Sequence, residues 1–388
     1  MIDVLVVLLV VSLAWLLYAY VGYPALLVGL AAFRRRASSE LTDVALPRVT
    51  VVTCAYDEVE VIGENVANKL ALDYPAELLD MIVVSDSSED GTDQAVQEFV
   101  ERHPGRVRLI RQHPRQGKTA GLNLALPHVR GEIVVFADAN SIFEPDALRR
   151  LVAPFADPRV GYVTGKMIYT NPDGSVTGDG CTTYMRYENR LRDLETRVGS
   201  VVGVDGGVDA MRAELYREMR ADQLPDFVLP LRVVEQGYRV AFAPDAILRE
   251  DALSDGGREY RMRVRVALRA MWALLDHRQL FDPFRHPIFS WQLTSHKLLR
   301  YGAFVPQFVA FLANLLLVGQ GRIFDLLFLG QIAFYVLSGL GLWSTRGGPR
   351  VPLSMPSYYL VLLNLACAHA AWKFVRGQKQ VLWAPRSG

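Results

Sequence analysis

The chain has 388 residues, of which 51% are hydrophobic, and its formal net charge is +1. This charge balance disfavours nucleic-acid binding, which normally requires a strongly basic face. The three cysteines, Cys54, Cys181 and Cys367, lie far apart and give neither a metal-binding spacing nor a disulfide framework. We expect them to be core residues in a reducing compartment.

The distribution of hydrophobic residues predicts membrane attachment at both ends of the chain. Residues 4–33 carry no charge and are followed by three arginines, so they exceed the length of about 20 residues that one span needs. The run lacks a basic region before it, which favours a retained anchor over a cleaved signal peptide. Three more uncharged runs predict a C-terminal bundle: 301–320, 326–344 and 353–372.

The arginines after the first run predict the side of the membrane on which the charged middle of the chain lies. Basic residues next to a span favour the cytoplasm, so we expect a multi-pass protein of the inner (cytoplasmic) membrane with a cytoplasmic domain. The basic "RGGPR" between the last two runs agrees with four spans, whereas "KFVRGQK" after the last run does not. The C-terminal topology therefore stays open.

Five segments follow from this distribution. Between the domain and the bundle, apolar residues mix with His296, Lys297 and Arg300, which is typical of an amphipathic helix at the headgroup level; an ordinary loop is the alternative. The expected organisation is an anchor (1–36), a cytoplasmic domain (37–285), the interface helix (286–300), a transmembrane bundle (301–375) and a tail (376–388).

The cytoplasmic domain reads as an α/β fold. An apolar strand ends in "TCAYDE", a helix is expected over 59–72, and further strands end in "VVSDSSEDGT", "RVRLIRQ" and "VVFADAN". Strands that alternate with helices predict βαβ units and a mostly parallel sheet. Ligands of such sheets bind beyond the carboxyl ends of the strands, at the point where the strand order reverses.

Polar side chains stand at these strand ends: Asp57 and Glu58, Asp86, and Asp138 with Asn140. Any one of them taken alone could be a helix cap or a turn residue. Together they predict a crevice with oxygen ligands for Mg²⁺ or Mn²⁺ and a phosphate-bearing ligand. The chain has neither the Walker A spacing nor a G-x-G-x-x-G after the first strand, which disfavours ATPases and dinucleotide enzymes.

Seven segments, in order, resemble those of the membrane-integrated family 2 glycosyltransferases, the group that includes cellulose, chitin and hyaluronan synthases. They lie within residues 47–300 and include "TCAYDE", "VVSDSSEDGT", "RQGKTAGLN", "FADAN", "VDGGVDAMR", "LPDFVLPLR" and "RMRVRV". The resemblance implies a Rossmann-like GT-A fold and an inverting sugar transfer from a nucleotide-diphosphate sugar, usually linked to UDP.

The resemblance also implies which residues hold the donor. Asp138 and Asn140 match the metal-binding Asp-x-Asp position, and the asparagine contributes no charge, so we expect weaker metal binding. Lys118 would help neutralise the phosphates. The expected donor-binding residues are Ala55, Tyr56, Glu58, Asp86, Lys118, Asp138, Arg263 and Arg265.

An inverting transfer needs a general base on the acceptor hydroxyl. Asp226 matches the family's catalytic carboxylate, although Pro225 replaces the first acid of the pair. Asp222 lies close enough in the sequence to be an alternative match for one of the two acids. A helix-capping acid is the alternative interpretation of Asp226. Asp205 and Gly206 match the acceptor-facing position, where an ordinary glycine turn is the alternative.

The segment "YRMRVRV" occupies the place of the family's Gln-x-x-Arg-Trp motif. Arg263 and Arg265 fit its basic positions, while Met262 and Val266 stand where Gln and Trp would be; a solvated or membrane-facing helix edge is the plain alternative. The missing Trp removes an aromatic platform for an acceptor sugar, which argues against processive polymerisation.

The leading hypothesis is a glycosyltransferase that extends an extracellular polysaccharide from a nucleotide-sugar donor. Its other partners would be a saccharide or lipid-linked acceptor and membrane lipids, and a translocation channel from so small a bundle would call for a homo-oligomer or an export partner. The alternatives are an enzyme that adds one sugar to a polyprenyl phosphate, and a non-catalytic nucleotide-binding transporter or receptor.

Overall fold

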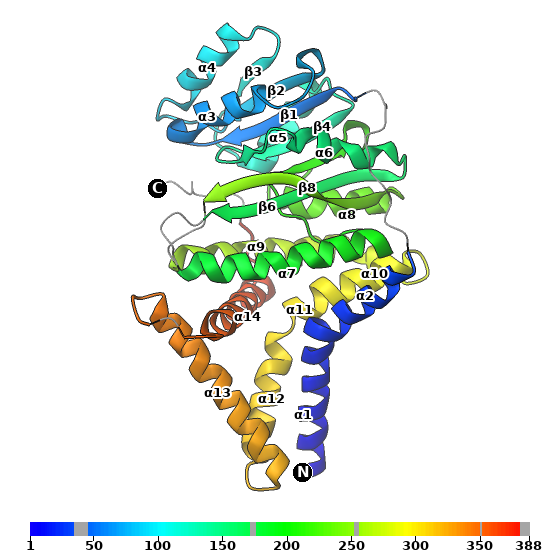
Figure 1. The fold of residues 1–388 in the computed structure, drawn as a ribbon, viewed down its shortest axis with the longest axis vertical. Helices are drawn as coiled ribbons and strands as arrows, with labels where there is room; N and C mark the ends of the chain where they lie inside the picture. Colours follow the sequence, from blue (N-terminus) through cyan, green and yellow to red (C-terminus); the bar gives the residue numbers. More distant parts are fainter. Residues whose placement is uncertain (35–45, 171–175, 252–255, 350, 381–388) are drawn as a thin grey trace.

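A computed structural model describes residues 1–34, 46–170, 176–251, 256–349 and 351–380. Arg35 and Arg36, the first residues of the expected cytoplasmic domain up to 45, the tail from 381 and the side chain of Cys181 lie outside this description. The described chain forms a sheet-containing domain above a fan of apolar helices, and two long helices, α7 and α9, run across the molecule between them (Figure 1).

One sheet organises the upper domain, in the order β3-β2-β1-β4-β7-β6-β8-β5. The strands β1 to β4 pair in parallel, as expected. The other half is mixed, because β7 runs antiparallel to β4 and β6, whereas β6 and β8 are parallel. The strands are β1 Val49–Ala55, β2 Leu79–Ser85, β3 Val107–Arg111, β4 Ile133–Asp138, β5 Ile142–Phe143, β6 Val160–Thr170, β7 Asp209–Arg212 and β8 Arg239–Asp251.

Helices cover both faces of the sheet. The helix expected from residue 59 is confirmed as α3. The helices of this part are α3 Val59–Leu70, α4 Thr92–Arg102, α5 Lys118–Ala125, α6 Ala147–Val152, α7 Val176–Val198, α8 Pro225–Glu235 and α9 Gly256–Asp276. Short 3₁₀ turns lie at Ala76–Leu78, Leu126–His128, Ala153–Ala156, Ala213–Leu215 and Arg278–Phe281.

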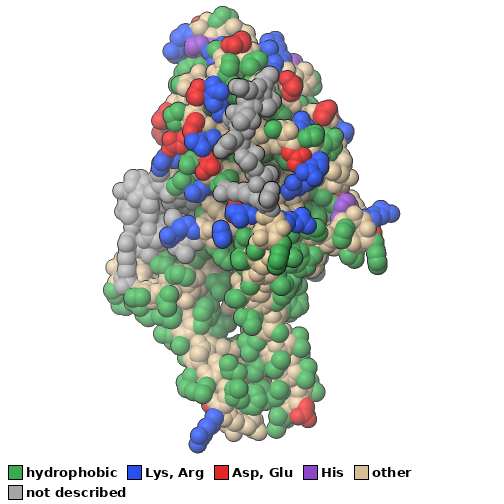
Figure 2. Space-filling model, turned by 45° about the vertical axis from the view of Figure 1, so that its right-hand side comes forward, with side chains coloured by type: hydrophobic (Ala, Val, Ile, Leu, Met, Phe, Trp, Pro, Cys, Tyr) green, Lys and Arg blue, Asp and Glu red, His purple; other side chains and the backbone are tan. Residues whose placement is uncertain are grey.

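Apolar helices make up the lower part, whose visible surface is dominated by hydrophobic side chains (Figure 2). Within the described part of the chain, three continuous helical stretches are long and apolar enough to cross a membrane, 2–32, 322–344 and 354–375, and 287–316 would be a fourth if its halves, bent by 56°, form one span. The expected anchor and C-terminal bundle are therefore confirmed as candidate spans. The helices are α1 Ile2–Leu17, α2 Tyr23–Ala32, α10 Pro287–Leu293, α11 Leu299–Tyr301, α12 Phe304–Leu316, α13 Arg322–Ser344 and α14 Ser354–Val375, with π-helical turns at Tyr18–Gly22 and Thr294–Leu298.

The expected interface helix is the broken segment from α10 to α11, and its polar residues face the protein. His296 is fully buried, and Arg300 is nearly so, because both pair with carboxylates of α7. The helix therefore joins the domain to the apolar helices through buried charges. Its depth in the membrane stays a prediction.

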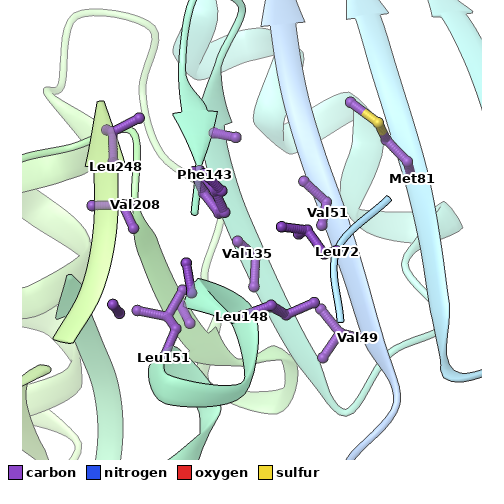
Figure 3. Close-up of a cluster of buried hydrophobic side chains, with 14 of the residues drawn as sticks. Val49, Val51, Leu72, Met81, Val135, Phe143, Leu148, Leu151, Val208 and Leu248 are labelled. Carbon is purple, nitrogen blue, oxygen red and sulfur yellow. The ribbon is translucent and has the colours of Figure 1, made fainter. Parts of the chain in front are cut away.

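Alternation along β1 builds two cores. Val49 and Val51 point to one face of the sheet and Val52 and Cys54 to the other, as the two-residue period of a strand requires. Figure 3 shows the first cluster, in which Leu148 and Leu151 of α6 belong to the same group of buried side chains as Val135 of β4. Both clusters consist of closely packed hydrophobic side chains, so they fix the strand ends from which the polar side chains emerge.

Candidate functional site

The carboxyl ends of β1, β2 and β4 meet at one edge of the sheet. In the parallel register, Cys54 lies opposite both Val84 and Asp138. The residues that follow these positions therefore emerge side by side. The strand order reverses between β1 and β4, which is the place where open α/β sheets bind ligands.

The loops after β1 and β2 form the side assigned to the nucleotide. Asp86 is buried, donates its N–H to the carbonyl oxygen of Ala55 at 2.8 Å, and accepts the N–H groups of Gln116 and Gly117 at 2.9 and 3.0 Å. It thereby holds the loop that leads into α5. The guanidinium of Arg115 in this loop lies 3.3 Å above the ring centroid of Tyr56, which forms an aromatic and cationic surface beside the strand ends.

The residues that lead into α3 also contact the loop after β2. The N–H of Glu58 donates to Thr92 Oγ1 at 2.9 Å, and the N–H of Asp57 donates to Ser88 Oγ at 3.1 Å. The loops after β1 and β2 are thus bound to one another rather than only adjacent. The nucleotide roles expected for Ala55, Tyr56, Glu58 and Asp86 stay predictions.

Lys118 joins the two carboxylates at the centre of the crevice. Its Nζ lies 2.7 Å from Asp138 Oδ1 and 3.5 Å from Asp226 Oδ1. Burial would lower the pKa of Lys118, but the two carboxylates outweigh burial and hold its pKa above the ordinary value. The lysine therefore stays charged, and it holds together Asp138 and Asp226, which are far apart in the sequence.

Two glycines let the backbone pass between these carboxylates. Gly206 and Gly207 have φ of +75° and +76°, a conformation that suits glycine. A β-carbon on Gly206 would lie 2.8 Å from the carboxyl carbon of Asp226, and one on Gly207 would lie 3.4 Å from Asp138 Oδ2. The chain at 203–207, called the glycine strap below, therefore sets the spacing between the two acids.

The turn that carries Asp138 is held from below by α3. Asn65 Nδ2 donates to the carbonyl oxygens of Asp138 and Ser141, both at 2.9 Å. Lys69, which is 1% exposed, donates to the carbonyl oxygen of Ser141 at 2.5 Å. Burial lowers the pKa of Lys69 to about 7. Neither residue was singled out from the sequence, since a polar residue within a helix gives no signal of this contact.

Asn140 and Glu250 complete the metal side of the crevice. Asn140 Nδ2 donates to Glu250 Oε1 at 3.2 Å, which orients the amide. Among the described residues no group of three His, Cys, Asp or Glu side chains forms a preassembled metal site. The pair Asp138 and Asn140 nevertheless fits a cation that arrives with a diphosphate, because Mg²⁺ is commonly bound by one or two protein oxygens plus substrate phosphates.

Asp226 stands in the first turn of α8, where the helix dipole favours its negative charge. Gln223, two residues before the helix, is held through its carbonyl oxygen by Thr119 Oγ1 at 2.8 Å and by the guanidinium of Arg269. Burial lowers the pKa of Arg269 to about 10. Arg269 is thus a positioning residue for Asp226 that the sequence did not reveal.

Arg263 and Arg265 of "RMRVRV" lie on different sides of α9. Burial lowers the pKa of Arg265, while the negative charges of Asp138 and Asp226 raise it. Arg265 therefore lies within the electrostatic reach of both acids of the crevice. Arg263 instead binds Glu259 at 2.8 Å and the hydroxyl of Tyr359 in α14 at 2.6 Å. The structure does not bring Arg263 together with the crevice, and its expected donor role stays a prediction without support from this geometry.

Asp205 also turns away from the crevice. Its carboxylate accepts a hydrogen bond from Arg192 of α7 at 2.5 Å and is 5% exposed. It thereby anchors the glycine strap to α7, while Gly206 faces Asp226. The acceptor-binding role expected for the pair stays a prediction.

Comparisons with known proteins cover the part of the chain that carries this crevice. The family model described as "Glycosyltransferase like family 2" matches residues 47–273. The probable glycosyltransferase YdaM of Bacillus subtilis is 27% identical over 234 residues, 57% of this chain and 55% of that protein. A poly-beta-1,6-N-acetyl-D-glucosamine synthase of Staphylococcus aureus is 23% identical over 244 residues, 62% of this chain and 57% of that protein.

A beta-monoglucosyldiacylglycerol synthase of Synechocystis sp. is 31% identical over 126 residues, 32% of this chain and 26% of that protein. The chain thus spans little more than half of these relatives at most. A solved mannosyltransferase of Pyrobaculum calidifontis, in complex with GDP-Man and Mn²⁺, has 24% identity and a TM-score of 0.72 over 96% of this chain and 99% of that one. This likeness confirms the expected GT-A fold.

Proposed function

Because the chain belongs to the glycosyltransferase like family 2 and is a glycosyltransferase, we propose that it transfers a sugar, with inversion, from a nucleotide-diphosphate sugar to an acceptor at the membrane surface. A UDP-sugar is the proposed donor. The observation that carries the proposal is the position of Lys118 between Asp138 and Asp226. It gives one crevice a metal-binding acid, a cation for phosphates and a carboxylate for the acceptor.

The residues divide into a leaving-group side and an acceptor side. Asp226 takes the proton of the acceptor hydroxyl, whose oxygen bonds to the anomeric carbon as the bond from that carbon to the diphosphate oxygen breaks. The diphosphate leaves with the electron pair. Lys118 and Arg265 lie near both acids and supply positive charge for it. A divalent cation, Mg²⁺ or Mn²⁺, held by Asp138 and Asn140 would neutralise the leaving diphosphate further.

The acceptor class was left open by the sequence, and the relatives differ in it. One relative is named as a polysaccharide synthase and another as a glucosyldiacylglycerol synthase. The absence of the Gln-x-x-Arg-Trp aromatic residue, replaced by Val266, supports single addition over processive extension. Membership of a glycosyltransferase family removes the support for a non-catalytic transporter or receptor. Placement in the inner membrane, a homo-oligomer and an export partner stay predictions.

The test uses the full chain purified in detergent. A panel of UDP- and GDP-sugars with Mn²⁺ or Mg²⁺ is screened for nucleotide release, with Asp138→Ala and Asp226→Asn beside the wild type. We expect Asp138→Ala to lose metal-dependent nucleotide binding. Asp226→Asn should keep that binding and lose transfer by about 10²- to 10⁴-fold, the usual range for a general base.

Asp222→Asn is the matched control, because Asp222 is a nearby acid that pairs with Arg220 and Lys379 instead of Lys118. It should keep most of the transfer rate. Full activity of Asp226→Asn would remove the assignment of the base. Failure of every nucleotide to bind in the presence of metal would overturn the assignment of the crevice.

A further inference from the structure

A second cavity lies where the domain meets the apolar helices. Its volume is about 310 Å³, and it is bordered by helices from both parts of the molecule. Five tyrosines line it, from the first span, α7, the end of α11 and α14, and Leu360 and Leu363 of α14 add an aliphatic wall. Tyrosine combines an apolar ring with a polar tip, which suits the boundary between hydrocarbon and water.

Most charges next to this cavity already have partners. His296 Nδ1 lies 2.7 Å from Glu195 Oε1, and its Nε2 lies 3.1 Å from Glu188 Oε2. Arg300 also pairs with Glu188, at 2.7 Å, and the hydroxyl of Tyr23 donates to Glu195 at 2.6 Å. These groups neutralise one another, as buried charges must.

Lys297 differs from its neighbours. It lines the cavity, yet its ammonium makes no hydrogen bond or ion pair within the ranges that the structure describes. Its ammonium instead faces an aromatic ring, since Nζ lies 5.9 Å from the centroid of Phe227. Among the described residues, Glu188 and Glu195 therefore act on this ammonium only from beyond ion-pair distance, and it can accept an anionic group as a direct partner.

The same ammonium contacts the strap that borders the proposed base. A β-carbon on Gly203 would collide with Lys297 Nζ, so the lysine rests directly on the glycine strap. Three residues further along the strap, Gly206 abuts Asp226. Phe227, over which the ammonium lies, follows Asp226 in the chain. A group bound at Lys297 therefore lies at one end of the strap whose other end contacts Asp226.

We propose that this cavity binds the headgroup of a membrane lipid that carries one phosphate and a free hydroxyl, with the phosphate on Lys297. The aliphatic wall on α14 continues into a candidate span, so the lipid chains can stay in the bilayer. That this lipid is the acceptor rests on the proposed function. Its hydroxyl gives its proton to Asp226 and its oxygen to the anomeric carbon, and the nucleoside diphosphate leaves with the electron pair.

The chemistry of Asp226 separates this lipid from a polyprenyl phosphate. A phosphate oxygen is already ionised at neutral pH and needs no base, whereas a hydroxyl does. A carboxylate beside the strap therefore favours a hydroxyl-bearing headgroup. A neutral diacylglycerol also has a hydroxyl, but it would leave Lys297 without a partner.

The test measures lipid binding without any donor, by isothermal titration of the full chain in detergent. The probes are dioctanoyl phosphatidylglycerol, dioctanoylglycerol and a short-chain polyprenyl phosphate. We expect phosphatidylglycerol to bind tightest, and Lys297→Met to weaken it by at least about tenfold, as the loss of a charge-assisted hydrogen bond implies. Leu363→Trp, which fills the cavity without changing charge, should weaken it as well.

Lys373→Met is the matched control: this lysine lies on α14 outside the cavity lining, and its removal should leave binding unchanged. Mn²⁺-dependent nucleotide binding checks that each variant is folded and tests the crevice separately. Wild-type affinity in Lys297→Met, equal or tighter binding of either other lipid, or no binding of phosphatidylglycerol would overturn the proposal. Lipid binding without sugar transfer would instead count against the proposed function alone.

Discussion

The crevice at the strand ends differs in construction from the junction below the domain, where Glu188 and Glu195 of α7 pair with His296 and Arg300. In the crevice, acids emerge directly after strands, and the nearby loops hold one another through backbone groups, as Asp86 holds Gln116 and Gly117. At the junction, Glu195 is fully buried and binds residues 101 and 172 positions away in the chain, His296 and Tyr23. The difference between them is exposure: the paired side chains of Lys118, Asp138 and Asp226 stay 20%, 33% and 25% exposed to a ligand, whereas His296 and Glu195 are fully buried with each other. At the junction, Lys297 is the exception, because its ammonium makes no ion pair with the described residues.

Glu195→Ala should have the largest effect on stability, because it breaks the junction. It leaves His296, the hydroxyl of Tyr23 and the N–H of Val202 without their acceptor in a buried place. We expect a loss of about 3–5 kcal/mol in the free energy of unfolding. Thermal unfolding in detergent measures it, and Mn²⁺-dependent nucleotide binding at low temperature should persist.

The control for this prediction is Glu98→Ala on α4. Glu98 is also a carboxylate in an ion pair, with Arg102 at 3.1 Å, but its side chain is 71% exposed. Its loss should cost about 0.5 kcal/mol or less. Equal melting temperatures for the two variants would show that the junction does not depend on its buried charges.

Gly206→Ala should have the next largest effect, on catalysis, because the strap connects the two regions. The β-carbon would lie 2.8 Å from the carboxyl carbon of Asp226, so the base must move. A displacement of this kind costs about 100-fold in rate, while nucleotide binding should remain. Single-turnover transfer kinetics measure the loss.

Gly237→Ala separates displacement from backbone strain. Gly237 also has a positive φ, +87°, but nothing lies within 4 Å of its missing β-carbon. This variant carries only the conformational cost of about 1 kcal/mol and should keep its transfer rate. If both alanines slow transfer equally, contact between the strap and Asp226 has no role in catalysis.

The sequence predicted the parts of the crevice that follow from local pattern. Alternating strands and helices placed Asp138 at a strand end, and the family resemblance singled out Asp226. Glu250 and Asn65 could not be found in this way, because each reaches the site across about 75 to 110 positions of chain. The antiparallel β7 was missed since a four-residue strand between a long helix and a turn gives little periodic signal.

The position of Arg263 outside the crevice has a geometric cause. Residues two apart on a helix do not share a face, so Arg263 and Arg265 could not both line the crevice once the segment folded as α9. A helical prediction for 256–276 would have forced a choice between them. The structure makes that choice by pairing Arg263 with Tyr359 of α14.

Lys69 offers the smallest and most specific prediction, in the crevice rather than the junction. Burial lowers its pKa to about 7 in the folded protein, compared with about 10.4 in an unfolded chain. Between these values the unfolded state binds one proton more than the folded state, so stability rises with pH across this window. Lys69→Met removes this pH-dependent contribution, so the free energy of unfolding of the wild type should rise relative to that of the variant by up to about 1.4 kcal/mol per pH unit above pH 7.

Unfolding measured at pH 7, 8 and 9 gives this slope. The control is Lys379→Met, which replaces an exposed lysine and should show no such slope relative to the wild type. A constant difference between wild type and Lys69→Met would mean that Lys69 stays protonated beneath the Asp138 turn, so that the turn carries a full positive charge beside the phosphate site.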